Sequence, residues 1–170
     1  MFHKRFADNT NHASVASRLR RQRFALFTAL LTGLPSPVRI LDIGGTQDYW
    51  HSMAPEAALL GWLQLTLLNL QPQAVSMPNF TSLVGDARAM PQFTDRQFDI
   101  VFSNSTIEHL GSFAGQQAMA GEVRRVGRGY YIQTPNRYFP IEPHFLFPGF
   151  QFLPLRLQPG AAGIRCDATT

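Results

Sequence analysis

The amino-acid sequence is poor in cysteine and in charged residues, and it lacks any uncharged apolar run long enough to span a bilayer. Its one cysteine, Cys166, excludes an internal disulfide and every zinc site built from several cysteines. The N-terminus shows no apolar signal core followed by a cleavage site. Neither the G-x-G-x-x-G spacing of dinucleotide sites nor the Gly-Lys-Ser/Thr of phosphate loops occurs, which argues against both nucleotide classes. We therefore expect a cytoplasmic protein without a transmembrane segment.

The composition is that of a folded domain, with 45% hydrophobic residues against 15% charged ones. A chain of 170 residues has room for one compact core. Positive charge is concentrated at one end, because the first 23 residues hold six Lys and Arg side chains against one acid, Asp8. We interpret this basic arm as a solvated helix face, with peripheral contact to an anionic membrane surface or to nucleic acid as alternatives. The sequence leaves a homo-oligomer open.

Apolar residues recur at helical spacing near the N-terminus and in short strand-like runs further along. The expected helices cover residues 14–34, 48–60 and 111–126, and the expected strands cover residues 38–43, 63–70, 80–84, 98–103 and 129–133. Ser14 and Asp48 are the expected N-caps of the first two helices. Strands that alternate with helices predict a Rossmann-like, doubly wound α/β fold with a mainly parallel sheet, flanking helices and no clear final antiparallel hairpin.

We expect one domain with three parts. Residues 1–36 form the basic arm and an amphipathic helix, and residues 37–136 form the Rossmann-like core that binds a cofactor. Residues 137–170 form a lid rich in aromatic residues and proline, followed by a frayed C-terminus. The aromatic side chains of this lid either wall an apolar substrate site or belong to the core or to a dimer contact.

Glycine or a polar residue directly follows each of the five expected strands. Parallel sheets bind ligands outside the carboxyl ends of their strands, where the strand order reverses. Glycines let the backbone approach a ligand closely, and Asp42 can accept hydrogen bonds from the turn or from a ligand ammonium. The candidate site therefore comprises Gly44, Gly45 and Thr46, then Asn69, then Asp86, then Ser103, Asn104 and Ser105, and finally Thr134 and Asn136.

Three segments give a more specific signal: ILDIGGT, VGDARAMP and FDIVFSNSTIEHL, in this order and spacing. Over residues 38–136 they resemble the class I S-adenosylmethionine-dependent methyltransferases, in particular the small-molecule, type 11-like group. The resemblance implies S-adenosyl-L-methionine as cofactor and methyl transfer to an O- or N-nucleophile of a small molecule, a hydrophobic one if the aromatic lid covers it. Because the family's sheet ends in an antiparallel hairpin, we also expect the chain to be cut short at its C-terminal end.

The resemblance further implies which parts of the site hold which parts of the cofactor. The glycine loop passes under the methionine part, a carboxylate and a backbone N–H after the third strand hold the adenine, and the end of the fourth strand borders the methyl donor. In this sequence these positions are Asp42, Gly44, Gly45 and Thr46 for the first, Asp86 and Ala87 for the second, and Ser103 and Asn104 for the third.

The sequence departs from the family pattern at two positions. The first loop of the family reads G-x-G, whereas here Gly45 is followed by Thr46 and Gln47. The second strand of the family ends in an acid that binds both ribose hydroxyls, whereas here it ends in Asn69. An amide oxygen can accept one such bond, but a charged acceptor is worth about 1 kcal/mol more. We expect weaker cofactor binding as a result.

Glu108 and His109 resemble the Glu-His pair that faces the substrate pocket in related small-molecule methyltransferases. A histidine that titrates near neutrality could take the proton of an attacking hydroxyl or amine, so both residues are candidate catalytic residues. The alternative is a structural histidine beside a turn-capping glutamate. A second pair, Glu142 and His144, raises a minor hypothesis in which all four residues hold a divalent cation. The main prediction contains no metal.

Two other functions stay open. A non-catalytic Rossmann-like binding protein, derived from a methyltransferase, would explain the missing ribose acid and loop glycine. A nucleic-acid methyltransferase would explain the basic arm. Against the second, the fourth strand is followed by SNSTIEHL and not by the Asn/Asp-Pro-Pro-aromatic motif of base-flipping amino methyltransferases.

Overall fold

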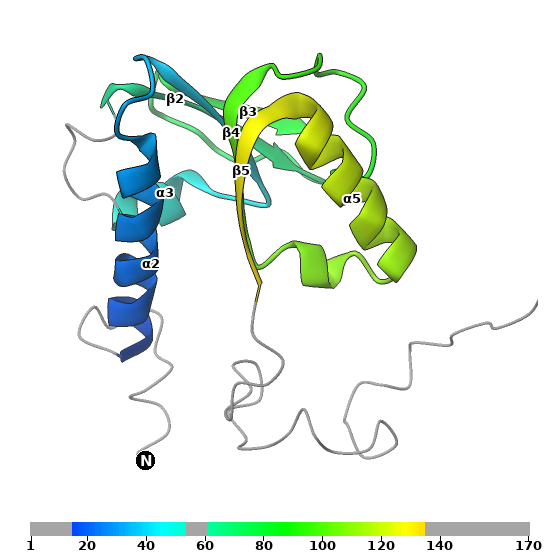
Figure 1. Cartoon of the computed structure of the whole chain (residues 1–170), viewed down its shortest axis with the longest axis horizontal. Helices are drawn as coiled ribbons and strands as arrows, with labels where there is room; N and C mark the ends of the chain where they lie inside the picture. Colours follow the sequence, from blue (N-terminus) through cyan, green and yellow to red (C-terminus); the bar gives the residue numbers. More distant parts are fainter. Residues whose placement is uncertain (1–14, 54–60, 135–170) are drawn as a thin grey trace, which may run out of the picture. The chain divides into compact units, whose positions relative to one another are not determined.

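The computed structural model describes residues 15–53 and 61–134, and its strands form one five-stranded sheet (Figure 1). The strands are β1 (Val38–Ile43), β2 (Leu63–Asn69), β3 (Phe80–Val84), β4 (Phe98–Asn104) and β5 (Gly127–Gln133). All of them run parallel, in the order β3-β2-β1-β4-β5. The order reverses between β1 and β4, which is where such sheets bind ligands. The predicted Rossmann-like α/β fold is confirmed.

Helices cover both faces of the sheet. α2 (Val15–Leu31) and α3 (Gln47–Met53) lie on one face, and α5 (Phe113–Val126) lies on the other (Figure 1). A short 3-10 helix, η1 (Ile107–His109), follows β4. Every connection between two paired strands is therefore a crossover, as parallel pairing requires.

Two buried apolar layers hold these helices to the sheet. In the layer beneath α2 and α3, the rings of Phe27 and Phe102 lie 4.9 Å apart at an angle of 62°, and Trp50 packs against both. In the layer beneath α5, Leu41 and Met119 are fully buried. β1 contributes to both layers, since neighbouring residues of a strand point to opposite faces. This explains why its sequence is almost continuously apolar.

The predicted elements are largely confirmed, with corrections at their ends. α2 ends at Leu31, before the predicted residue 34, and β2 ends at Asn69, one residue before its predicted end. β4 extends one residue further at its carboxyl end than predicted, and β5 begins two residues earlier than predicted. α5 begins at Phe113 because Ser112 Oγ accepts from the N–H of Gly115 at 3.1 Å and caps it. Ser14 and residues 54–60 lie outside the described residues.

The predicted cap of α3 is wrong. Thr46 Oγ1, and not Asp48, accepts the hydrogen bond from the N–H of Tyr49 at 3.2 Å. Asp48 lies within the first turn of the helix, where its negative charge is favourable beside the helix N-terminus. Thr46 thus has a structural role in ending the turn that precedes α3.

The outer surface of α2 carries both basic and apolar side chains. Arg18 and Arg23 are exposed, and so are three large apolar side chains, Leu19, Leu26 and Leu30. Among the helices that the structure describes, none is long and apolar enough to cross a membrane.

Candidate functional site

The turn after β1 lies where the strand order reverses, and its conformation requires glycine. Gly44 has a φ of +81°, in the left-handed region, and a Cβ there would overlap the side chain of Thr106. A Cβ on Gly45 would overlap the carboxylate of Asp42. Gly44 itself is exposed and Gly45 is half-buried. The two glycines therefore let the turn pack closely against its own chain and leave its backbone accessible to a ligand.

A buried carboxylate lies against this turn. Asp42 is 1% exposed, and its Oδ2 accepts a hydrogen bond from Nε1 of Trp50 at 2.7 Å. Its Oδ1 is buried and has no hydrogen-bond partner among the described residues. Burial raises the pKa of Asp42 from 3.8 to about 7, and the bond from Trp50 offsets part of that effect. The sequence pattern suggested backbone or ligand donors for Asp42, whereas the observed donor is an indole of α3.

Hydroxyl groups fix the end of β1 to β4. Ser103 Oγ and Thr106 Oγ1 each donate to the carbonyl oxygen of Ile43 at 3.0 Å. On the other side, the N–H of Gly44 donates to the carbonyl of Leu68 in β2 at 2.9 Å. Ser103 is fully buried, so its hydroxyl serves the fold. Its place beside the cofactor stays a prediction, as does that of the half-buried Asn104.

At the end of β2, Asn69 contacts the glycine turn directly. Its Nδ2 donates to the carbonyl oxygen of Gly45 at 2.9 Å. The neighbouring Gln47, at the start of α3, accepts from the N–H groups of Ser76 and Met77 and donates to Ser76 Oγ. The end of β2 and the connection to β3 are thus tied to the turn after β1.

At the end of β3, the carboxylate of Asp86 is already paired. Both of its oxygens accept from the guanidinium of Arg88, and Oδ1 also accepts from the backbone N–H of Arg88 at 2.8 Å. These bonds lower the pKa of Asp86, so it stays ionised. Ala87 is 7% exposed and packs in the layer beneath α5. The predicted adenine contact would therefore share the Asp86 carboxylate with Arg88.

The candidate catalytic pair lies in η1, after β4. Glu108 is half-buried, and its Oε2 accepts from Thr134 Oγ1, at the end of β5, over 3.2 Å. Its Oε1 is buried without a partner among the residues described. His109 is exposed.

Ser105, just before η1, has a φ of +58° and donates its N–H to Gln133 O at 2.9 Å, which turns the chain at the carboxyl end of the sheet.

Sequence reasoning missed four residues that shape this edge: Trp50, Thr106, Arg88 and the side chain of Gln47. Thr106 stands inside a segment that the prediction did quote, three residues after Ser103. Arg88 lies two residues after Asp86, a spacing at which an aspartate commonly bonds its own backbone. Trp50 gave a weaker signal, because nothing in its spacing indicates that an indole reaches the carboxylate of a neighbouring strand.

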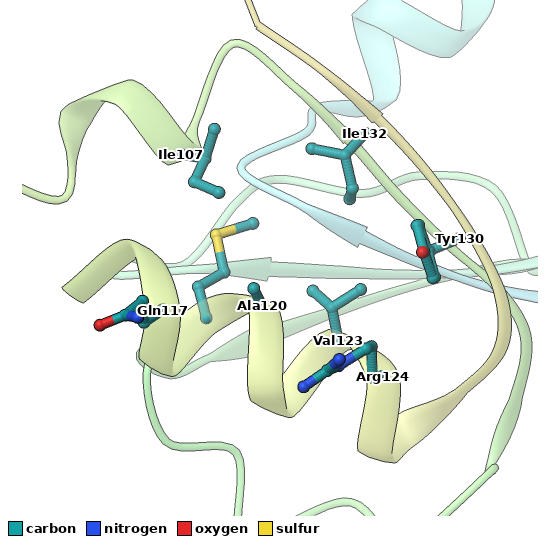
Figure 2. Close-up of a pocket in the computed structure, with 8 residues that line it drawn as sticks. Ile107, Gln117, Ala120, Val123, Arg124, Tyr130 and Ile132 are labelled. Atoms are coloured by element: carbon teal, nitrogen blue, oxygen red, sulfur yellow. The ribbon is translucent and has the colours of Figure 1, made fainter. Parts of the chain in front are cut away.

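An open pocket of about 410 Å³ lies between α5 and β5 (Figure 2). Ile107, Val123 and Ile132 point into it, and Arg124 of α5 and Tyr130 of β5 also line it. None of the predicted cofactor residues lines this pocket. Of the three residues of η1, Ile107 lines the pocket, and it directly precedes Glu108 of the candidate catalytic pair.

The divalent-cation site stays a hypothesis. Glu142 and His144 lie outside the described residues, as does the aromatic lid. Among residues 15–53 and 61–134, no three His, Cys, Asp or Glu side chains gather as metal ligands would.

The sheet order and the connecting helices define a Rossmann-like α/β domain. The chain matches a family model described as a methyltransferase domain over residues 41–129, more than half of its length. It therefore belongs to the S-adenosylmethionine-dependent methyltransferase family, as the sequence motifs indicated. The cofactor that this membership implies is S-adenosyl-L-methionine.

Solved structures share the fold. A protein of Anabaena variabilis, provisionally described as a methyltransferase from an antibiotic biosynthesis pathway, has a TM-score of 0.55 and 23% identity over 78% of this chain and 57% of its own. An S-adenosylmethionine-dependent methyltransferase of Aquifex aeolicus has a TM-score of 0.51 and 16% identity, over 80% of this chain and 78% of its own. At such identities the likeness concerns the fold alone.

Curated relatives match a shorter segment. Two uncharacterized proteins of Mycobacterium tuberculosis, from strains CDC 1551 and H37Rv, are 31% identical to this chain over 67 residues. The match covers 39% of this chain and 23% of each relative, so the shared segment is less than a quarter of their length.

Proposed function

We propose that the chain binds S-adenosyl-L-methionine at the carboxyl edge of β1, β2 and β3, with the end of β4 at its border, and transfers its methyl group to an O- or N-nucleophile of a small molecule. One observation supports this above all: a glycine turn at the switch point packs on the buried carboxylate of Asp42. Oδ1 of Asp42, which has no partner among the described residues, fits a ligand that brings a hydrogen-bond donor or a positive charge.

The proposed cofactor contacts follow the edge of the sheet. Gly44 and Gly45, with Asp42 behind them, would hold the methionine part. Asp86 would accept from the adenine amine with the part of its carboxylate that Arg88 leaves accessible, since the Asp86 side chain is 35% exposed. The remaining proposed contacts, around these anchors, are Thr46, Ala87, Ser103 and Asn104, and Asn69 adjoins the site through its bond to Gly45.

Bound S-adenosylmethionine supplies an activated sulfonium methyl group. An in-line displacement requires donor and acceptor to be held about 3 Å apart with water excluded, and it requires no nucleophilic side chain. His109, exposed in η1, is the proposed base that takes the acceptor's proton. Glu108 would bind the acceptor's donor group through its unpartnered Oε1. A hydrophobic acceptor is proposed from the aromatic lid, whose residues lie outside the described ones.

Calorimetric titration with S-adenosylmethionine tests the binding step. The wild type should bind saturably, and Gly44→Val should abolish binding because the turn cannot accept a Cβ. Asp86→Ala should weaken binding by about tenfold, the effect of one charge-assisted hydrogen bond. Gly121→Val is the matched control, since Gly121 lies in α5 with open space around its Cβ position. A folded wild-type protein that does not bind would refute the proposal.

Transfer of a labelled methyl group to a panel of small hydroxylated and amino acceptors tests the reaction. Glu108→Gln and His109→Ala should each lower the rate while the affinity for S-adenosylmethionine stays within about twofold, because neither residue is assigned to the cofactor. Binding without transfer to any acceptor would favour the non-catalytic binding protein. Transfer to nucleic acid instead would favour the alternative suggested by the arginines of α2.

A further inference from the structure

The side chain of Asn69 is used as a hydrogen-bond donor. Its Nδ2 lies 2.9 Å from the carbonyl oxygen of Gly45, and its own backbone carbonyl accepts from the N–H of Gly85 at 2.9 Å. Asn69 therefore links the turns that follow β1 and β3. An aspartate of the same size would have no proton to donate at neutral pH, and it would place a carboxylate oxygen against the Gly45 carbonyl.

The side chain of Gln47 makes a second link on the same side of the turn. Its Oε1 accepts from the N–H of Ser76 at 2.8 Å and from that of Met77 at 3.2 Å, and its Nε2 donates to Ser76 Oγ at 2.9 Å. These three bonds join residues that lie 29 and 30 positions apart in the sequence. They hold the connection between β2 and β3 against the first turn of α3.

Only three residues separate β1 from α3, and each of them is tethered. Gly44 donates to Leu68, Gly45 accepts from Asn69, and Thr46 caps the N–H of Tyr49. A turn that is fixed before a ligand arrives loses little conformational freedom on binding. The two side-chain links thus supply order to a turn that contains two adjacent glycines.

We propose that Asn69 and Gln47 are positioning residues, which hold the glycine turn and the β2–β3 connection in place and so set the shape of the cofactor site between them. Asn69 acts through its Nδ2 donor and not as a replacement for a ribose-binding acid. The effect on cofactor affinity rests on the function proposed above, whereas the bracing itself does not.

Asn69→Asp should change the affinity for S-adenosylmethionine in opposite directions, depending on whether Asn69 positions the turn or binds the ribose. If Asn69 positions the turn, the variant should bind S-adenosylmethionine about tenfold more weakly, since one hydrogen bond is replaced by a repulsion. If Asn69 is a ribose acceptor, the added charge should strengthen binding. Gln47→Ala should also weaken binding, by about threefold to tenfold, whereas Gln47→Glu keeps the acceptor for Ser76 and Met77 and should rescue most of the loss.

Amide hydrogen exchange by NMR tests the brace without any ligand. In the ligand-free protein, Gln47→Ala should speed exchange at Ser76 and Met77, Gln47→Glu should retain their protection, and Asn69→Asp should speed exchange at Gly44. Gln71→Ala, at an exposed position of the same connection, is the control and should change neither exchange nor affinity.

Tighter binding by Asn69→Asp, or unchanged exchange in both Asn69→Asp and Gln47→Ala, would overturn the proposal. If the wild type binds no S-adenosylmethionine while the exchange changes occur as expected, the bracing is supported and the proposed function fails.

Discussion

The two halves of the carboxyl edge of the sheet differ in which groups hold their polar side chains in place. At the ends of β1, β2 and β3, Asp42, Asn69 and Asp86 each have a partner within the chain: an indole, a carbonyl and a guanidinium. Asp42 also keeps one buried oxygen, Oδ1, without a partner among the described residues. At the ends of β4 and β5, within the part of the chain that the structure describes, Glu108 keeps one buried oxygen without a partner, and its other oxygen has a single bond of 3.2 Å.

The difference matches the two tasks of a methyl-transfer site. The half assigned to the cofactor is preorganised by its own hydrogen bonds, which fix the turn and the carboxylates before binding. The half assigned to the acceptor presents a half-buried glutamate and an exposed histidine on a short 3-10 helix. We therefore expect substitutions in the first half to affect stability and cofactor affinity, and substitutions in the second half to affect mainly the reaction.

The largest expected effect concerns Asp42. Its pKa is raised from 3.8 to about 7, so the folded state binds this proton more tightly than the unfolded state. The stability from this group is complete below about pH 4, is lost as the pH rises, and is gone above about pH 7. Asp42→Asn removes the titration and still offers an oxygen to Trp50. The free energy of unfolding of the variant minus that of the wild type should rise by about 4 kcal/mol across this range.

Urea denaturation of both proteins at a series of pH values measures this difference. Because other titrating groups are common to the two proteins, their contributions cancel. A difference that does not change with pH would mean that the Asp42 carboxylate is not buried as the structure shows, and the first half of the edge would lose its central feature.

The next effect separates steric overlap from backbone strain in the glycine turn. Gly44 and Gly33 both have positive φ, but a Cβ overlaps Thr106 only at Gly44, since no atom lies near the Cβ position of Gly33. Gly33→Ala should lower the free energy of unfolding by about 1 kcal/mol, and Gly44→Ala by about 3 kcal/mol. Thermal and urea unfolding measure both losses.

A double mutant sharpens the interpretation. Thr106→Ala removes the overlapping atoms, so the loss in Gly44→Ala/Thr106→Ala should be smaller than the sum of the single losses by at least about 1 kcal/mol. Equal losses for Gly44→Ala and Gly33→Ala would show that the turn is not packed against η1 as described.

The sequence was sufficient to predict β1 and β3 with the ends that the structure gives them, because each is a short segment with several apolar residues that ends directly before a glycine. It also indicated that Gly44 and Gly45 belong to the site. It could not decide between Thr46 and Asp48 as the cap of α3, since both side chains can cap a helix and the choice depends on where the left-handed φ of Gly44 directs the chain.

The partners of the site residues were harder to predict. The bond between Asp42 and Trp50 depends on α3 packing against the sheet, and the bond between Asn69 and Gly45 depends on the parallel pairing of β1 with β2. Periodicity predicts which elements form, but not which side-chain atoms they bring within 3 Å of each other. The resemblance placed Asn69 beside the ribose because it compares positions in the sequence. It does not predict in which direction the amide of Asn69 points.

The smallest expected effect lies in the second half of the edge. Thr134→Val removes the hydroxyl that donates to Glu108 Oε2, a bond between exposed or half-buried groups. We expect the free energy of unfolding to fall by about 0.5 kcal/mol and the dissociation constant of S-adenosylmethionine to change by less than about twofold. Thr134→Ser keeps the hydroxyl and serves as the control. A loss of affinity as large as that of Asn69→Asp would show that Glu108 and Thr134 belong to the cofactor half, and the division of the edge into two halves would then be wrong.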